Sequence, residues 1–165
     1  MLTPRPAAPA VQDPWRVSLR GYGPVRAGMT VAEASRALGG PVDPGPEEGS
    51  PGCAHARPPG FPEGVALMVR DGRVARLEVS EPGVPTVRGA EVGMTEDSVR
   101  ALYGERLDVR DHPYAVGPFA NGHYLVYRAD AADRAFGLIF ETDGRVVTSF
   151  RAGLADAVRL IEGCS

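Results

Sequence analysis

Apolar and polar positions follow two rhythms along the chain, one with the period of a helix and one with the period of a strand. Segments 31–38 and 96–103 carry apolar residues at helical spacing, and each is preceded by Gly-Met-Thr and followed by glycine. Thr30 and Thr95 suit the N-cap position, because a hydroxyl oxygen there accepts a hydrogen bond from an unpaired backbone N–H. Glu33 completes a capping box with Thr30, and the closing glycines suit the left-handed conformation that ends many helices. We therefore predict two short, capped helices.

Strand-like alternation follows the first predicted helix. Segments 65–69 and 74–79 alternate, and Asp71-Gly72 between them predicts a two-residue hairpin turn. Successive side chains of a strand point to opposite faces, so this turn also predicts which residues share a face. Four residues are expected together on one face of the hairpin: Ala66, Met68, Ala75 and Leu77.

The second half of the chain repeats this plan. Its alternating segments fall at 107–109, 124–128, 135–141 and 145–151, and Asp143-Gly144 supplies a matching turn. The remaining segments are less regular. Segment 15–25 alternates loosely and indicates a strand, 39–62 and 112–122 are expected to be loops, and 154–161 fits a helical turn or a strand.

Because the order of elements is the same in both halves, we predict an α+β fold built as a tandem repeat. Each repeat is a short helix followed by an antiparallel β-meander, with the helices packed on one face of the sheet. Residues 1–14 are rich in Pro and Ala and are expected to form a flexible tail. Residues 15–85 would form the first repeat and residues 86–165 the second repeat with a C-terminal segment, sharing one domain.

The two capped helices with their meanders resemble the β-lactamase inhibitor protein fold. The half-unit is also similar to small outer-membrane assembly lipoproteins of the SmpA/OmlA type. The resemblance covers roughly residues 20 to 150 and rests mainly on Val92-Gly93-Met94-Thr95, Leu38-Gly39 and Tyr103-Gly104. It implies a helix-plus-sheet repeat, an exported setting and function by protein–protein contact without catalysis.

The chain also departs from both families. The inhibitors have short disulfides within each repeat, which two cysteines this far apart in the sequence cannot reproduce. The lipoproteins carry a lipidated cysteine near the N-terminus, and here no cysteine precedes Cys53. No position matches the inhibitory loop or the lipoprotein partner motifs, so no functional residue is carried over from the resemblance.

Composition narrows the class of function. The apolar fraction of 43% is enough for a sizeable core, and a net charge of −3 with interspersed charges gives no reason to expect nucleic acid. Every basic residue is Arg, which fits base composition better than phosphate recognition. No run approaches the roughly 18 apolar residues of a transmembrane segment.

The two cysteines bear on the compartment. Cys53 lies in a predicted loop, and Cys164 lies one residue from the end of the chain. A disulfide between them would fasten the loop to the C-terminal segment. The chain-entropy model gives about 4–5 kcal/mol for closing a loop on the order of 100 residues. A disulfide predicts a periplasmic or secreted protein, whereas two free thiols would indicate a cytoplasmic one. The N-terminal tail fits either the mature start of an exported protein or the true start of a cytosolic one.

Candidate chemistry is sparse. Cys53 and His55 offer two ligands for zinc, and His112, His123 or Cys164 would complete such a site, but no spacing matches a known metal site. Gly21–Arg26 lacks the third glycine of a dinucleotide loop, and a nucleophile elbow is absent. We therefore predict no metal, no cofactor and no catalytic residue.

The densest group of contact-forming side chains lies in and just after the second predicted loop. Aromatic and hydrogen-bonding residues on such a loop suit a partner's side chain or a sugar ring, or they simply cover the edge of the sheet. The candidate binding residues are His112, Tyr114, Phe119, Asn121, His123 and Tyr124. We expect an exported, non-catalytic binding protein of a bacterial envelope that contacts a protein partner through its sheet face or loop 111–124. The alternatives are a carbohydrate-binding, lectin-like module and, third, a hydrolase.

Overall fold

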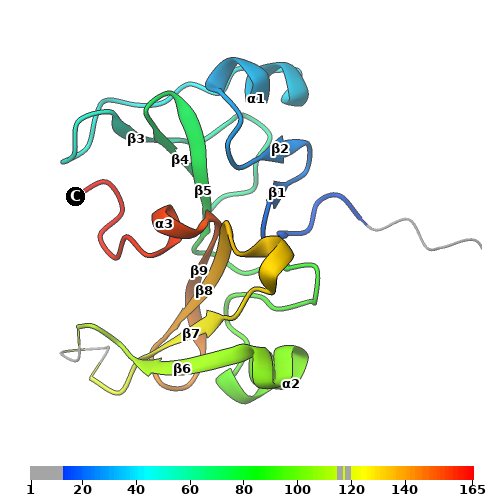
Figure 1. Ribbon diagram of the computed structural model, residues 1–165, viewed down its shortest axis with the longest axis vertical. Helices are drawn as coiled ribbons and strands as arrows, with labels where there is room; N and C mark the ends of the chain where they lie inside the picture. Colours follow the sequence, from blue (N-terminus) through cyan, green and yellow to red (C-terminus); the bar gives the residue numbers. More distant parts are fainter. Residues whose placement is uncertain (1–12, 115–116, 118–119) are drawn as a thin grey trace, which may run out of the picture.

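The computed structural model describes residues 13–114, 117 and 120–165, and its main feature is one antiparallel sheet (Figure 1). The sheet has seven strands in the order β3-β4-β5-β9-β8-β7-β6. These strands are β3 (Cys53–Ala56), β4 (Val65–Arg70), β5 (Arg73–Val79), β6 (Leu107–Asp111), β7 (His123–Tyr127), β8 (Phe136–Thr142) and β9 (Val147–Leu154). A separate two-stranded sheet contains β1 (Gly21–Tyr22) and β2 (Val25–Arg26).

Two of the three α-helices begin and end where the sequence predicts. These are α1 (Val31–Leu38) and α2 (Glu96–Tyr103), and α3 (Ala155–Val158) follows β9 directly. Short 3-10 turns form η1 (Gly104–Arg106) and η3 (Ala131–Asp133). The predicted caps are confirmed: the Glu33 N–H donates to the Thr30 hydroxyl at 3.1 Å, and the Ser98 N–H donates to the Thr95 hydroxyl at 3.2 Å.

The predicted tandem α+β repeat is wrong. Both halves of the chain contribute to one continuous sheet, because β9 pairs with β5 on one side and with β8 on the other. The halves are unequal, since three strands of the sheet precede α2 and four follow it. The helices also do not share one face: Ala34 of α1 and Val99 of α2 pack in the main core, whereas Ala157 of α3 packs on the opposite side of the sheet. The fold is mostly β, with short helices on both faces.

The predicted loop and strand boundaries need three smaller corrections. Residues 53–56, expected in a loop, form the edge strand β3 paired with β4. The predicted strand at 15–25 is reduced to an isolated bridge at Val17 and the two-residue strands β1 and β2. The ambiguous segment 154–161 begins as the end of β9 and continues as the helical turn α3.

The hairpin of β4 and β5 contains a bulge that changes which side chains share a face. Arg76, rather than Ala75, lies opposite Met68, so Ala75 is the extra residue of the bulge. Leu77 therefore lies on the core face and not beside Met68, which corrects the predicted arrangement. Arg76 and Glu78 are left on the opposite face of the sheet.

The main core lies between the sheet and a layer made of α1, α2 and the N-terminal segment. Its largest side chains are fully buried and come from both halves of the chain. They include Leu67, Leu125, Phe140, Val147 and Phe150. Burial of such side chains is the dominant favourable contribution to folding, so the two halves are stabilised together.

The opposite face of the sheet is covered in its middle by α3 and the C-terminal segment (Figure 1). The predicted disulfide between Cys53 and Cys164 is present and connects residues 111 apart in sequence. Met68 and Ala157 pack against the two buried cysteines. The end of the chain is thereby fastened to the first half.

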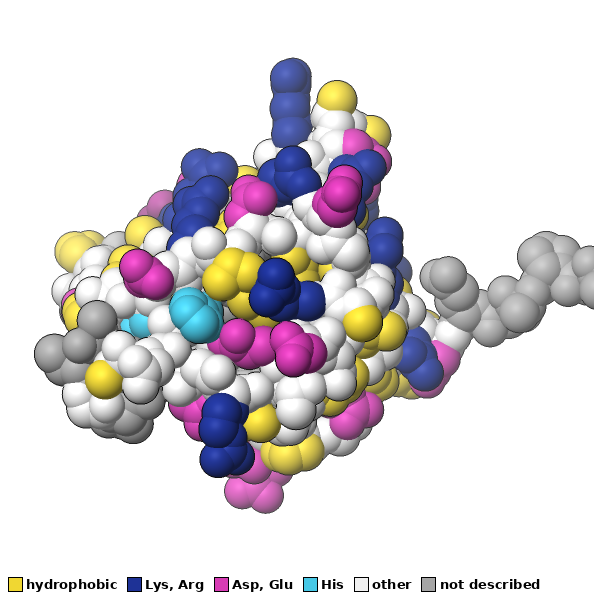
Figure 2. Space-filling model, turned by 90° about the horizontal axis from the view of Figure 1, so that it is seen from below, with side chains coloured by type: hydrophobic (Ala, Val, Ile, Leu, Met, Phe, Trp, Pro, Cys, Tyr) yellow, Lys and Arg dark blue, Asp and Glu magenta, His cyan; other side chains and the backbone are white. Residues whose placement is uncertain are grey.

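The end of the molecule that carries α2 shows acidic, basic and apolar side chains interspersed (Figure 2). Neither sign of charge forms a continuous patch in this view. Among the described residues, no helix combines the length and the apolar character needed to cross a membrane.

Candidate functional site

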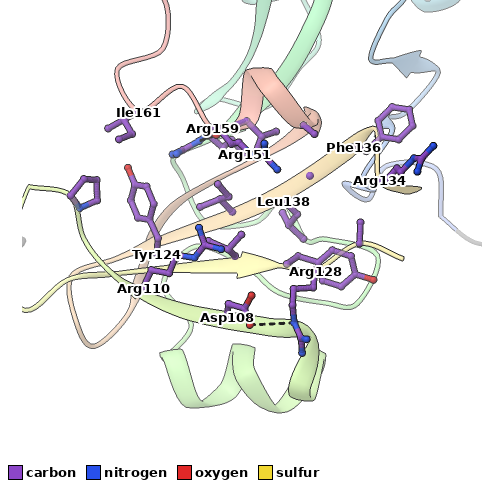
Figure 3. A pocket seen from close by; sticks show the side chains of 18 of the residues that line it. Asp108, Arg110, Tyr124, Arg128, Arg134, Phe136, Leu138, Arg151, Arg159 and Ile161 are labelled. Atoms are coloured by element: carbon purple, nitrogen blue, oxygen red, sulfur yellow. Dashed lines mark hydrogen bonds and ion pairs between the residues drawn. The ribbon is translucent and has the colours of Figure 1, made fainter. Parts of the chain in front are cut away.

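A hollow of about 690 Å³ opens on the sheet face that carries α3. Strands β6 to β9 form one side of it, and α3 with the residues that follow forms the other (Figure 3). Part of its lining is apolar: Val126, Phe136, Leu138, Ile139, Val158 and Ile161. The hollow therefore combines a sheet floor with a wall built from the C-terminal segment.

The charged residues of the hollow are mostly basic. Five arginines line it: Arg110, Arg128, Arg134, Arg151 and Arg159. The only acidic residues in the described lining are Asp108 and Asp111, so the formal charge of the lining is +3. The whole chain carries −3, which makes the hollow a basic region on an acidic protein. Such a region attracts anionic groups.

Strand alternation explains how β6 and β7 supply side chains to this face. Asp108 pairs with Val126 and Arg110 pairs with Tyr124, and all four residues line the hollow. Arg134 follows η3, and the other arginines follow or belong to β7, β9 and α3. The basic side chains therefore approach from several sides (Figure 3).

Three of the five arginines have no side-chain partner among the described residues. Arg128 lies 3.2 Å from the Asp108 carboxylate and also donates to the Glu105 carbonyl. No ion pair or side-chain hydrogen bond joins Arg110, Arg134 or Arg159 to another residue in the described part of the chain. A guanidinium presents its donors in a fork that matches a carboxylate. These three arginines are therefore the groups most available to a ligand.

Arg151 places a fixed positive charge at the floor of the hollow. Its side chain is 7% exposed, its Nε donates to the Val158 carbonyl at 2.6 Å, and Nη1 lies 3.6 Å from the Glu141 carboxylate. The guanidinium stacks over the Tyr124 ring at 5.1 Å. Nη2 is buried and has no hydrogen-bond partner among the described residues. A buried donor without a partner carries an energetic cost.

Three of the sequence-predicted binding residues lie together beside the hollow. Tyr124 lines it, and the buried His112 ring contacts the Tyr124 ring edge-on, with centroids 5.0 Å apart. His112 Nε2 is 2.6 Å from the Glu141 carboxylate, and its Nδ1 accepts from the Tyr114 N–H at 3.0 Å. The Tyr114 hydroxyl donates to Glu162 in the C-terminal segment. These residues brace one end of the hollow.

The other predicted binding residues do not join this group. His123 precedes Tyr124 on β7 and therefore points to the opposite face, where its Nδ1 lies 2.8 Å from the Glu96 carboxylate of α2. Asn121 is exposed beside the turn at Gly144. Phe119 lies outside the described residues. Strand alternation thus places His123 and Tyr124 on opposite faces of the sheet, so the described residues of the predicted binding site do not form one site.

Sequence reasoning missed the arginines of the hollow. Arg110 directly follows the predicted strand 107–109, and only the continuation of that strand through residue 111 in β6 gives Arg110 a face on the sheet. Arg134 and Arg159 lie in connecting segments and have no signal for their position. Their placement depends on how η3 and α3 dock on the sheet, which is a long-range property.

A second hollow, of about 620 Å³, lies near β3 and has acidic character. His55 bridges two carboxylates there: Nδ1 is 2.6 Å from Glu48, and Nε2 is 3.2 Å from Glu78. The Glu78 carboxylate raises the pKa of His55, burial opposes this, and Glu48 adds to the increase. Burial alone would raise the pKa of Glu78, but His55 and Arg76 outweigh it and lower that pKa to about 2. The cluster is a structural network of ion pairs.

Among the described residues, a free thiolate is missing from the acidic cluster, and a hydroxyl or thiol nucleophile is missing from the lining of the basic hollow. Glu48, His55 and Cys164 come close together, but the Cys164 sulfur is bonded to Cys53 and is not available as a thiolate. Among the described residues, the lining of the basic hollow contains no Ser, Thr, Cys or His that would act as a nucleophile or its base. The chemistry that this hollow supports is binding of an anionic group.

Comparisons with protein-family models, with curated proteins and with solved structures find no match for this chain. The function therefore has to be inferred from the chemistry of the hollow itself.

Proposed function

We propose that this is an exported, non-catalytic binding protein whose basic hollow receives an acidic side chain and an adjacent apolar side chain of a protein partner. The observation that carries the proposal is the presence of Arg110, Arg134 and Arg159, unpaired among the described residues, around an apolar floor. The disulfide between Cys53 and Cys164 supports the exported setting, because disulfides persist in oxidising compartments.

The shape and chemistry favour a side chain with both charge and apolar surface. Val126, Phe136 and Ile161 offer accessible contact area that a bare inorganic anion would leave unused. A carboxylate next to an aromatic or branched side chain would pair with an arginine and cover this floor at the same time. Arginine and aromatic residues are also the types that contribute most at protein interfaces.

The hollow is less suited to the alternative ligand, a neutral sugar. A sugar site needs a free aromatic face, and two aromatic rings in the hollow already carry a cation. Arg151 lies over the Tyr124 ring at 5.1 Å, and Arg20 lies over the Phe136 ring at 4.7 Å. The third ring, Tyr127, packs edge-on against Tyr103 at 5.7 Å. Each guanidinium covers one face of its ring, which reduces the aromatic surface on which a sugar would stack.

The proposal is tested by selecting ligands from a random peptide library displayed on phage, with the oxidised full chain immobilised. We expect enrichment of peptides that place Asp or Glu next to an apolar residue. A synthetic copy of a selected peptide is then titrated calorimetrically into Arg134→Ala and Arg159→Ala. Each variant should weaken binding by about tenfold or more, since a hydrogen-bonded charge pair is worth roughly 1.5–3 kcal/mol.

Arg36→Ala is the matched control, because Arg36 is exposed on α1, on the other face of the sheet. Its affinity should equal that of the unaltered protein. Selected peptides without acidic residues, or equal losses in all three variants, would overturn the proposal. Binding of a neutral oligosaccharide on a glycan array, insensitive to Arg134→Ala and Arg159→Ala, would replace it with the lectin alternative.

A further inference from the structure

A loop covers one outer edge of the seven-stranded sheet, whereas no described strand or loop covers the other edge. At β3, the preceding loop covers the edge, because the Gly45 N–H donates to the His55 carbonyl at 3.0 Å and the Glu48 N–H donates to the Cys53 carbonyl at 2.9 Å. At β6, no strand or loop of the described residues pairs with the outer edge. β6 is therefore the open edge of the sheet (Figure 1).

The backbone groups that face this open edge follow from the pairing with β7. The Arg128 N–H donates to the Arg106 carbonyl at 2.8 Å, and the His112 N–H donates to the Gly122 carbonyl at 2.9 Å. The register between these two pairs is unbroken. Along an antiparallel strand, residues whose backbone N–H and C=O bond to one neighbour alternate with residues whose backbone groups point the other way. In β6 the backbone groups of the even-numbered residues therefore bond to β7, and those of the odd-numbered residues point outward.

Val109 and Asp111 therefore present both backbone groups outward, and Leu107 presents its carbonyl, since its N–H is bonded to the Gly104 carbonyl. β6 is a regular five-residue strand without proline or a bulge. Proteins usually protect an open edge with such features, because it can otherwise pair with another strand. β6 does carry charged side chains, which also oppose non-specific pairing, but Asp108 and Arg110 are opposite in sign and so complement each other across two copies.

We infer that β6 is an interface with a second copy of this chain, in which two β6 strands pair antiparallel about an axis through Val109. In this register Asp108 of each copy lies opposite Arg110 of the other, on the side of the hollow. Residues 108 and 110 then occupy non-hydrogen-bonded positions, where cross-strand side chains are closest. The symmetry produces this ion pair twice.

The neighbouring registers are excluded by the same charges. Outward-facing residues must pair with outward-facing residues, so the register can shift only in steps of two. One shift places Asp108 opposite Asp108 of the other copy, and the other shift places Arg110 opposite Arg110. Like charges directly opposite each other are destabilising in a sheet. Of these three registers, only the one centred on Val109 brings opposite charges together.

The two exposed Val109 side chains, each 41% exposed, meet on the other face in this register. Burial of this apolar surface adds to the backbone hydrogen bonds. The interface is short, so we expect a weak dimer that requires concentrations up to ~1 mM for full formation. Both basic hollows then lie on the same face of one continuous sheet, on either side of the axis.

The test is the oligomeric state of the oxidised full chain, measured by sedimentation and light scattering from low micromolar to ~1 mM. The unaltered protein should change from one chain to two as concentration rises. Arg110→Asp and Asp108→Arg each place like charges opposite each other and should weaken dimerisation by about tenfold or more, because each change acts in two contacts. The double variant restores opposite charges and should recover dimerisation.

A backbone test separates strand pairing from general adhesion. Val109→Pro removes an outward-facing backbone N–H. Val109→Ala shortens the side chain but keeps the backbone N–H. Only the proline variant should be monomeric, and circular dichroism melts establish that both variants are folded. A chain that stays monomeric up to ~1 mM, equal dimerisation of the two Val109 variants, or no rescue by the double charge reversal would overturn the inference. Peptide binding to the hollow is measured separately, with Arg134→Ala and Arg159→Ala, because both residues lie outside β6.

Discussion

The disulfide between Cys53 and Cys164 ties the edge strand β3 to the end of the chain. The same contact is reinforced by the Ser50 N–H, which donates to the Cys164 carbonyl at 2.6 Å. Arg159 and Ile161, which line the basic hollow, lie between α3 and this anchor. One covalent bond therefore holds a wall of the proposed binding site in place.

Removing this bond should destabilise the fold. Cys164→Ser is expected to lower the free energy of unfolding by about 2–5 kcal/mol, mainly because the unfolded chain regains the freedom that the crosslink removed. Urea unfolding of the oxidised protein and the variant measures the difference. Reductant should lower the melting temperature of the unaltered protein and leave Cys164→Ser unchanged. An identical melt with two titratable thiols in the native protein would contradict the disulfide.

The N-cap of α2 gives a second prediction. Thr95→Ala removes the acceptor for the Ser98 N–H and should reduce stability by about 0.5–2 kcal/mol. Thr95→Ser keeps the hydroxyl and should lose much less, which makes it the matched control. The midpoint of urea unfolding reports both. Equal stability of Thr95→Ala and Thr95→Ser would mean that the hydroxyl does not cap the helix.

The ion-pair network around Glu78 predicts a dependence on pH. The folded-state pKa of Glu78 is about 2, below the ordinary value of 4.5, so its contribution is complete above pH 4.5 and is lost as pH falls toward 2. The pKa of His55 is raised above 6.5, so its contribution is complete below that pH and is lost as pH rises through the raised value. Stability from this cluster is therefore greatest between these two ranges.

Glu78→Gln should remove about 1–3 kcal/mol near neutral pH and flatten the decline in stability below pH 4.5. Urea unfolding across the pH range gives both quantities. Glu48→Gln is the matched control, because the Glu48 side chain is 47% exposed and contacts the other ring nitrogen of His55. We expect a smaller change in this variant. Parallel pH profiles for Glu78→Gln and the unaltered protein would refute the role of Glu78.

The junction between the two halves of the sheet depends on Gly153. A Cβ at this position would lie 2.5 Å from the Ala75 carbonyl oxygen and 2.6 Å from the Arg76 Cα. Gly153→Ala should therefore destabilise the protein by about 1–3 kcal/mol. Gly137 pairs with Gly153 across the sheet, yet its Cβ would meet the nearest Val158 carbon at an ordinary 3.5 Å. Gly137→Ala should lose about 1 kcal/mol or less, and thermal unfolding distinguishes the two.

Local signals in the sequence were sufficient for α1, α2 and the turn at Asp71-Gly72, but they left α3 undecided between helix and strand. Capping chemistry and turn geometry act over a few residues, so Thr30, Thr95 and this turn predict their own structure. The bulge at Ala75 has no comparable signal, and it shifts the register by one residue. That shift places Arg76 and Glu78 on the face with α3, which the regular hairpin pattern does not predict.

Long-range pairing explains the larger errors. The repeated order of elements indicates two similar units, but β9 inserts between β5 and β8 and merges them into one sheet. Likewise, alternation predicts the face of Tyr124, whereas Arg134 and Arg159 reach the hollow only after η3 and α3 have docked. The sequence therefore indicates the face on which Tyr124 lies, but it does not indicate the basic residues that define the hollow.

The way α3 is held has a consequence for recognition at this face. Arg76 donates to the carbonyls of Ala157 and Leu160, at 2.8 and 2.7 Å, and Arg151 donates to the carbonyl of Val158. The C-terminal segment is thus an internal ligand, whose backbone oxygens the arginines of the sheet already bind. An extended acidic segment of a partner, entering the hollow next to Arg159, would continue the same row of oxygen-to-guanidinium contacts along the sheet.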